Sequence, residues 1–311
     1  MRDSNDNGWR AHRPHIEGRG GCPLSGELTG RVVVITGAAG YVAGRILPDL
    51  RDRYDLTLLD VKTSGRDGSD VEGVVIADLL DRNRDSYREH FRGADAVVHS
   101  GFTRSAKPED RFWGELDNVA MAYNVYQTCL EEDVRRVVVI SSNHAADYYE
   151  RLIWDGKMGM VTPDMTPLSD NFYGWAKSAY ELLGFAFAAG KIGDGKKLQN
   201  VHLRIGAPRE TDMARCSPDD LKRMHRALGA YISVRDQVQL TIKSIETEDI
   251  EDEHGVPFQV FYGVSGNTHN FWSLANARDV IGYDPEDDSS ITFADRVAEI
   301  LLAAQKGRRT D

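Results

Sequence analysis

Short, almost uninterrupted apolar runs alternate with amphipathic stretches along this chain, and that alternation constrains the fold more than any other feature. The apolar runs are residues 32–36, 56–60, 74–78, 96–100, 137–142 and 201–205. Continuous β-branched runs are typical of strands buried on both faces of a parallel sheet. Stretches with helical periodicity lie between them, at residues 81–91, 116–131 and 173–188. The succession predicts an α/β fold with a Rossmann-type doubly wound parallel sheet.

The two ends of the chain differ from this pattern. Residues 1–29 are rich in Gly, Arg, Asn and His without hydrophobic periodicity, which predicts a disordered arm; within it, Ile16-Glu17-Gly18-Arg19 resembles a protease-cleavage linker. Residues 30–206 are expected to form the dinucleotide-binding domain with the catalytic residues. Beyond it, helical patterns at 219–228, 236–246 and 273–281 and a late strand at 258–262 predict a small substrate-binding lobe, 207–311, interleaved with that domain.

The composition of the chain restricts the classes of partner that we expect it to bind. The chain has 311 residues and a net charge of −11, which works against nucleic acid or an anionic membrane as a partner. No apolar run is long enough to span a membrane, and no signal peptide is recognisable. Cys22, Cys129 and Cys216 lie far apart, which argues against disulfides or a metal site. We therefore expect a cytoplasmic enzyme with a small-molecule substrate.

A glycine-rich turn follows the first predicted strand and opens a predicted helix, in the sequence Thr36-Gly37-Ala38-Ala39-Gly40-Tyr41-Val42-Ala43-Gly44. Such a turn lets the backbone approach a pyrophosphate, while the helix N-terminus offers N–H donors. We expect Gly37 to form the tight turn, Gly40 to allow close approach, and Tyr41 and Val42 to belong to the cofactor site. The pattern predicts a dinucleotide cofactor.

Acidic and small residues end the next predicted strands. Asp60 is placed to accept hydrogen bonds from the adenosine ribose hydroxyls, which favours NAD over NADP, although Lys62 and Arg66 lie just beyond it. Asp78 and Leu79 are expected at the adenine edge. The residues expected beside the nicotinamide ribose are Ser100, Gly101 and Phe102.

Tyr173 and Lys177 have the Y-x-x-x-K spacing, which places both side chains on one face of a helix. The ordinary pKa of a phenol, about 10, is too high for a base near neutrality, and a neighbouring Lys and a positively charged nicotinamide are both expected to lower it. Ser142, Asn143 and His144 follow the fifth strand, at the sheet edge where α/β proteins bind ligands. Ser142 is expected to orient a substrate hydroxyl while Tyr173 takes its proton.

Together with Asn118, these motifs resemble the extended short-chain dehydrogenase/reductase family over about residues 31–305. Three strings are more specific: Ser141-Ser142-Asn143-His144-Ala145, Leu203-Arg204-Ile205-Gly206 and Val260-Phe261-Tyr262-Gly263-Val264-Ser265. They resemble the NAD-dependent uronate dehydrogenases and the archaeal NAD-dependent glucose-6-phosphate dehydrogenases. The resemblance implies oxidation of the anomeric hydroxyl of a hexuronate or other acidic aldose to a lactone.

The same resemblance implies roles for individual residues. Asn118 would belong to the cofactor site, and Ser142, Asn143, His144 and Tyr173 would contact the sugar. Arg226, at a matching distance before Ser233, would grip the acidic end of the sugar. Arg104 stands at a substrate loop position where uronate dehydrogenases carry serine, and Ala207 replaces a polar residue. The segment between Tyr148 and Asp170 is also distinct, which leaves the sugar open.

Two other functions remain possible at this point. A nucleotide-sugar epimerase or dehydratase would retain NAD, but the chain after Tyr173 is short for a lobe that holds a nucleotide sugar. A dinucleotide-sensing regulator commonly lacks the Tyr/Lys pair. The helix expected at 173–188 is apolar nearly all round, which predicts a homo-oligomer with a dimer favoured.

Overall fold

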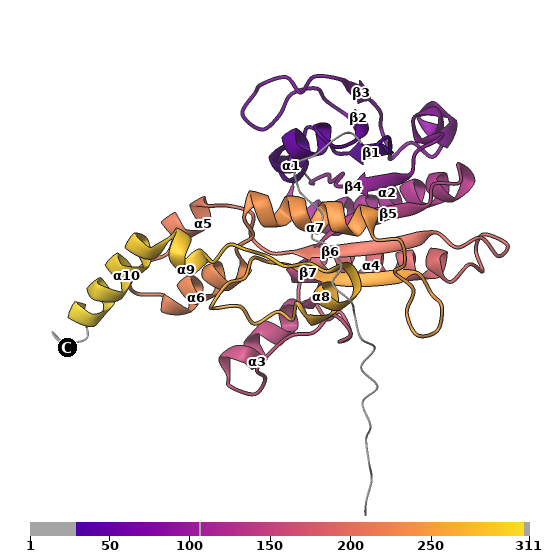
Figure 1. The fold of residues 1–311 in the computed structure, drawn as a ribbon. Coiled ribbons are helices and arrows are strands. Elements are labelled where there is room, and N and C mark those ends of the chain that lie inside the picture. Colours follow the sequence, from indigo (N-terminus) through magenta and orange to yellow (C-terminus); the bar gives the residue numbers. More distant parts are fainter. Residues whose placement is uncertain (1–28, 106, 308–311) are drawn as a thin grey trace, which may run out of the picture.

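The structure is a computed structural model that describes residues 29–105 and 107–307, so the predicted N-terminal arm lies almost wholly outside the described residues. Within them, parallel strands form a sheet of seven in the order β3-β2-β1-β4-β5-β6-β7 (Figure 1). The strands are β1 (Val32–Thr36), β2 (Asp55–Asp60), β3 (Val74–Ile76), β4 (Ala96–His99), β5 (Arg136–Ser142), β6 (Gln199–Ile205) and β7 (Phe258–Gly263). This order confirms the predicted doubly wound α/β fold.

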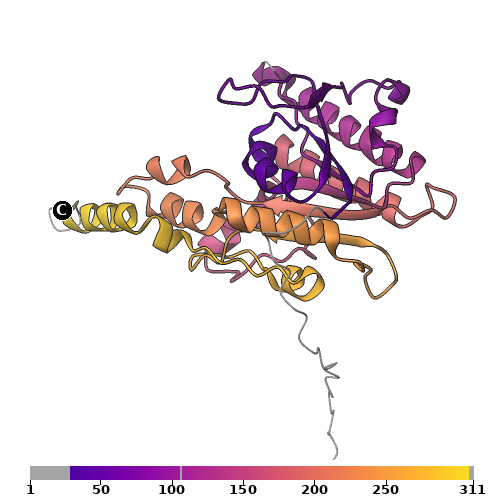
Figure 2. The ribbon, with the colours of Figure 1, turned by 45° about the horizontal axis from the view of Figure 1, so that its top comes forward.

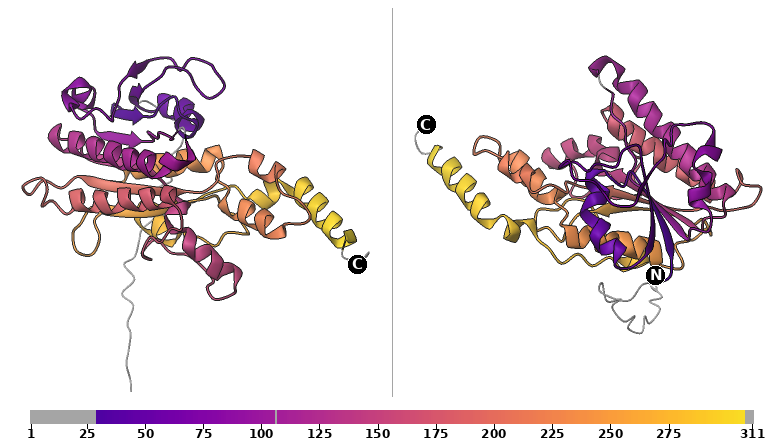
Figure 3. Two further views of the ribbon diagram at one scale, coloured as in Figure 1. Left: turned by 180° about the vertical axis from the view of Figure 1, so that it is seen from behind. Right: turned by 90° about the horizontal axis from the view of Figure 1, so that it is seen from above.

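Helices cover both faces of the sheet. The helices are α1 (Tyr41–Arg51), α2 (Arg111–Glu131), α3 (Glu150–Trp154), α4 (Phe172–Ala188), α5 (Thr211–Ala214), α6 (Leu221–Ala230), α7 (Val234–Glu246), α8 (Ala275–Ile281), α9 (Ser289–Thr292) and α10 (Ala294–Gly307). Helices α2 and α4 run side by side on one face (Figure 3), and α1 and α7 pack together on the other (Figure 2).

The buried strands explain why both faces need cover. In β1, Val33 and Ile35 belong to the core under α1 and α7, whereas Val34 belongs to the core under α2 and α4. Strand β5 repeats this division, with Val137 and Val139 on the α2–α4 side and Val138 on the other. Each strand thus contributes apolar side chains alternately to two cores, as its unbroken apolar sequence predicts.

A third, smaller core lies away from the sheet. Met213, Cys216, Met224, Leu228 and Ile300 pack together there. They come from the region of α5, α6 and α10, which extends sideways from the sheet (Figure 1). The predicted lobe thus has a core of its own. Two elements of the range 207–311 nevertheless belong to the main body: β7 pairs with β6 along the sheet, and α7 packs on α1.

The prediction of a helix at residues 81–91 is wrong. The segment forms two 3₁₀ turns, Arg84–Ser86 and Arg88–Phe91. The Asp81 carboxylate accepts a hydrogen bond from the Asn83 amide, and the Ser86 hydroxyl donates to the Asn83 carbonyl, so local side-chain bonds replace helical ones. Tyr87 and Phe91 are still buried. The periodicity therefore identified the buried side chains but not the backbone that carries them.

Candidate active site

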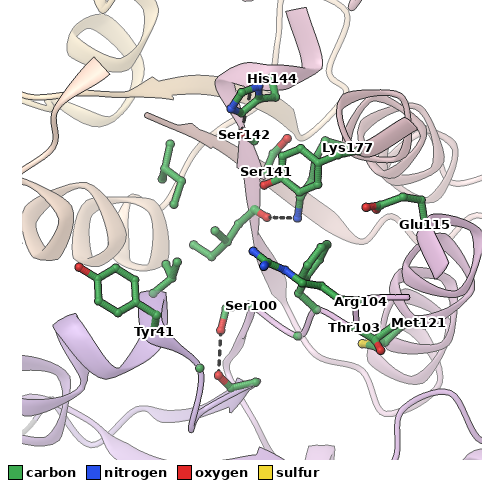
Figure 4. Close-up of a pocket in the computed structure, with 18 of the residues that line it drawn as sticks. Tyr41, Ser100, Thr103, Arg104, Glu115, Met121, Ser141, Ser142, His144 and Lys177 are labelled. Carbon is green, nitrogen blue, oxygen red and sulfur yellow. Dashed lines mark hydrogen bonds between the residues drawn. The ribbon is translucent and has the colours of Figure 1, made fainter. Parts of the chain in front are cut away.

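A pocket of about 1530 Å³ opens where the strands end at their carboxyl edge. Its walls come from the turns and loops that follow β1, β2, β4, β5 and β6 and from the start of α4 (Figure 4). Parallel α/β sheets bind their ligands at this edge, where the loops of neighbouring strands converge. The volume is large enough for a dinucleotide together with a small substrate.

The glycine turn after β1 has the backbone that its sequence predicts. Gly37 has a φ of +67°, and a Cβ placed on it would lie 2.7 Å from the backbone of Gly101. Gly40 precedes α1 in an extended conformation, and no side chain of the described residues caps that helix. The first amides of α1 therefore point into the pocket region without partners from their own helix. The turn after β1 thus packs directly on the turn after β4, which leaves no room for a side chain at Gly37, and the free amides of this glycine cradle fit the pyrophosphate of NAD.

Asp60 lies at the pocket wall with its carboxylate fixed by the backbone. It accepts hydrogen bonds from the amides of Ala39 (3.0 Å) and Val61 (2.7 Å). A carboxylate held in this way can accept further hydrogen bonds from ribose hydroxyls. Every other residue predicted for the cofactor, Asn118 excepted, lines the same pocket: Gly37, Gly40, Tyr41, Val42, Asp78, Leu79, Ser100, Gly101, Phe102 and Lys177.

Tyr173 and Lys177 lie in the first two turns of α4. That helix begins at Phe172, and the Asn171 side chain caps it by accepting from the Gly174 amide (2.9 Å). The buried Lys177 Nζ donates to the carbonyl of Ile140 (3.0 Å) and lies 5.7 Å from the Tyr173 ring centroid (Figure 4). The end of β5 therefore fixes the lysine beside the phenol.

Burial governs the acid–base properties of this pair. Desolvation raises the pKa of Tyr173, and Glu115 raises it further, while the Ser142 hydroxyl and the guanidinium groups of Arg104 and Arg209 lower it. Desolvation also lowers the pKa of Lys177 to about 8, against the charges of Glu115 and Glu181. At Tyr173 loss of hydration therefore outweighs the positive charge that the protein itself supplies, and a pKa lowered by Lys177 together with a bound, positively charged nicotinamide stays a prediction.

Ser142, Asn143 and His144 lie together at the end of β5 and line the pocket. The Ser142 hydroxyl accepts from the His144 amide (3.2 Å). The His144 ring packs edge-on against Tyr173, with centroids 5.6 Å apart, and its Nδ1 lies 2.5 Å from an Asp147 carboxylate oxygen. Within the described residues, the buried Asn143 Nδ2 has no hydrogen-bond partner, so it is available to a ligand.

The two arginines predicted for the substrate differ in their surroundings. Arg104 lines the pocket near the Phe102 ring and forms no ion pair within the part of the chain that the structure describes. Arg226 also lines the pocket, but Glu150 binds its guanidinium through Nε (2.7 Å) and Nη2 (2.8 Å). The binding of an acidic sugar by Arg226 stays a prediction, and the ion pair between Arg226 and Glu150 argues against this binding.

Asn118 does not line the pocket. Its side chain accepts from the Thr103 amide (2.8 Å) and donates to the Thr103 carbonyl (2.9 Å), so it fixes the loop that follows β4. A direct contact with the cofactor stays a prediction, whereas support of that loop is observed. Asn118 also donates to Glu115 (3.2 Å), a pocket residue that the sequence analysis missed. The sequence feature that could have identified Glu115 is its position three residues before Asn118, on the same helix face.

Neither a membrane span nor a metal site is found in residues 29–105 and 107–307. No helix there is long and apolar enough to cross a bilayer, and no cluster of three or more His, Cys, Asp or Glu side chains is arranged to hold a metal ion.

A family model described as the NAD dependent epimerase/dehydratase family matches residues 33–198. The chain belongs to this family. The match confirms the predicted extended short-chain dehydrogenase fold and NAD as the cofactor.

Relatives of this chain align with it over most of its length. The NAD-dependent glucose-6-phosphate dehydrogenase of Haloferax volcanii is 30% identical over 271 residues, 83% of this chain and 94% of the relative. The L-arabinose 1-dehydrogenase (NAD(P)(+)) of the same organism is also 30% identical, over 83% of this chain and 97% of the relative. The uronate dehydrogenase of Pseudomonas syringae pv. tomato is 26% identical, with 83% of each chain covered.

Solved structures give the same fold. A glucuronic acid dehydrogenase from Chromohalobacter salexigens is 23% identical with a TM-score of 0.66, covering 86% of this chain and 89% of the other. A uronate dehydrogenase from Agrobacterium tumefaciens is 24% identical with a TM-score of 0.65, at the same coverage.

Proposed function

We propose that this chain, an NAD-dependent sugar dehydrogenase, oxidises the anomeric hydroxyl of an aldose to a lactone. The observation that carries the proposal is the position of Tyr173. Its phenol stands with Ser142 and Lys177 at one end of a pocket whose other end is the glycine cradle for NAD. The relatives named for glucose 6-phosphate, arabinose and uronate support a sugar as the substrate.

The residues divide the chemistry among them. The Ser142 hydroxyl orients the hydroxyl on C1, and Tyr173 as phenolate takes its proton. Bound NAD supplies the acceptor for the hydride that leaves C1, so the C1–O bond becomes the lactone carbonyl. Lys177, fixed by the Ile140 carbonyl, is placed to bind the cofactor ribose and to favour the phenolate by its charge. Asn143, with its unpaired Nδ2, holds a second sugar hydroxyl.

The reaction is tested with the purified protein, NAD and a panel of free aldoses, aldose phosphates and uronates. We expect NADH to appear with at least one free sugar, and a product that mass spectrometry and NMR identify as a lactone opening to the corresponding acid. A ketone at another ring carbon would contradict C1 oxidation. Tightly retained NAD and isomerisation of a nucleotide sugar without net NADH would instead identify an epimerase.

We also propose that the chain forms a homodimer through the outer surface of α2 and α4, and that it works in the cytoplasm. Large apolar side chains are exposed on this surface: Trp113, Leu116, Phe172, Trp175, Leu182 and Phe185. Contiguous apolar surface of this kind commonly marks an interface. Leu182, which is 66% exposed, is a direct probe. We expect a dimeric mass by light scattering and a monomeric mass for Leu182→Glu; a wild-type monomer at micromolar concentration would contradict the proposal.

A further inference from the structure

Arg226 projects from α6 into the sugar end of the pocket, but it is already neutralised. Glu150, which begins α3, forms two hydrogen bonds to its guanidinium, at 2.7 and 2.8 Å. The carboxylate of Asp147 lies 3.9 Å from the same guanidinium. The Glu150 and Asp147 side chains are only 13% and 12% exposed, so solvent screens these charges weakly.

A further carboxylate faces this region from a different element. Asp212, in α5, lines the pocket and lies within electrostatic range of Arg226. Within the described residues, Glu150 and Asp147 thus lie directly beside the Arg226 guanidinium, whereas the more distant Asp212 also pairs with Arg215 (3.8 Å). A sugar carboxylate or phosphate placed here would meet repulsion as well as a guanidinium that is already paired.

Asp147 also contacts a histidine at the reacting end of the pocket. Asp147 lies 2.5 Å from His144 Nδ1, and because an ionised carboxylate only accepts, that nitrogen carries a proton. In the neutral ring the other nitrogen, Nε2, is then an acceptor. His144 lines the pocket and packs on Tyr173, so it offers an acceptor for a sugar hydroxyl at the reacting end.

We infer that the pocket selects aldoses whose far end is uncharged, with Glu150 as the residue that excludes acidic sugars by occupying Arg226. The inference rests on the proposed oxidation at C1 and names the substrate class for that site. Arg226, held by Glu150, keeps its remaining N–H groups as donors to neutral ring hydroxyls. Arg104 also lines the pocket and lies within electrostatic range of Tyr173, so a variant of Arg104 belongs to the test.

Matched sugar pairs test this inference directly. D-glucose and D-glucuronate, and likewise D-galactose and D-galacturonate, differ only in the group at C6. We expect the wild-type enzyme to have a kcat/KM at least about tenfold higher for the neutral sugar of each pair, the factor that about 1.4 kcal/mol of binding free energy produces. The corresponding 6-phosphates are expected to be poor substrates as well.

The variant Glu150→Gln removes the negative charge and retains the shape. We expect the ratio of kcat/KM for the uronate over the neutral sugar to rise about tenfold, mainly through a lower KM for the uronate. Glu286→Gln is the matched control, because it breaks an exposed pair with Arg235 outside the pocket and should leave both rates unchanged. Should Glu150→Gln fold poorly, Asp212→Asn tests the same charge balance from α5.

Failure of the inference and failure of the proposed function give different results. A wild-type preference for uronates, or a Glu150→Gln variant that loses uronate activity, would overturn the inference while C1 oxidation stands; Glu150 would then only position Arg226. If uronate activity disappeared in Arg104→Ala, the acid would be held by Arg104, which also overturns it. Absence of NADH with every free sugar would overturn the proposed function itself.

Discussion

The two ends of the pocket depend on different kinds of structural feature. At the cofactor end, backbone geometry forms the site: Gly37 in a left-handed conformation, and Asp60 held by two amides. At the sugar end, side-chain charges form it: Arg226 and Glu150 are paired across 76 residues of sequence. Backbone geometry is encoded by residues next to one another in the chain. Charge pairs depend on which distant elements meet, so a few substitutions can change them while the fold persists.

Tyr173 lies where the two ends meet, and its removal should have the largest effect. Tyr173→Phe deletes the proton acceptor and keeps the ring that packs on Phe102 and His144. General-base catalysis contributes about 10²–10⁴-fold, so we expect turnover to fall by that order while NAD binding measured by calorimetry stays close to wild type. Tyr123→Phe on the exposed surface of α2 is the control. Near wild-type turnover in Tyr173→Phe would mean that another group takes the proton.

A substitution of Gly37 tests the cofactor end of the pocket without changing the sugar end. In Gly37→Ala the new Cβ would lie 2.7 Å from the Gly101 backbone at a φ of +67°, so the turn must shift. We expect NAD affinity to fall at least about tenfold, the factor for about 1.4 kcal/mol, with the ratio between sugars unchanged. Gly44→Ala, whose Cβ meets nothing within 4 Å, should keep NAD affinity and gain about 0.5–1 kcal/mol of stability in α1. Equal NAD affinities in the two variants would contradict this role of Gly37.

What the sequence predicts well follows the same division. The strands, the glycine turn, and the placement of Ser142, Tyr173 and Lys177 at one sheet edge all depend on local pattern and on strand order, and the structure shows them together. The prediction of a helix at residues 81–91 failed because the side chains of Asp81 and Ser86 form hydrogen bonds with the nearby backbone. The pairing of Glu150 with Arg226 could not be predicted, since no spacing in the sequence relates α3 to α6.

The smallest expected effect comes from Glu115, which projects from α2 toward Lys177 (Figure 4). Arg104 on the loop after β4, Lys177, Tyr173 and Tyr180 on α4, and the Asn118 amide all face this carboxylate. Its charge raises the pKa of both Tyr173 and Lys177. Glu115→Gln removes that charge, so both groups should lose their protons at lower pH.

The pH profile of kcat/KM reports this change. At saturating NAD, whose positively charged nicotinamide favours the phenolate, the acid limb requires the Tyr173 phenolate, so this limb should move to lower pH in Glu115→Gln. Because Glu115 is only partly buried, we expect a shift of less than about one pH unit with little change in the maximum. Asp117→Asn, exposed on the same helix, should not move this limb. A shift toward higher pH would contradict the assignment of Tyr173 as the base, because loss of a negative neighbour can only make a phenol more acidic.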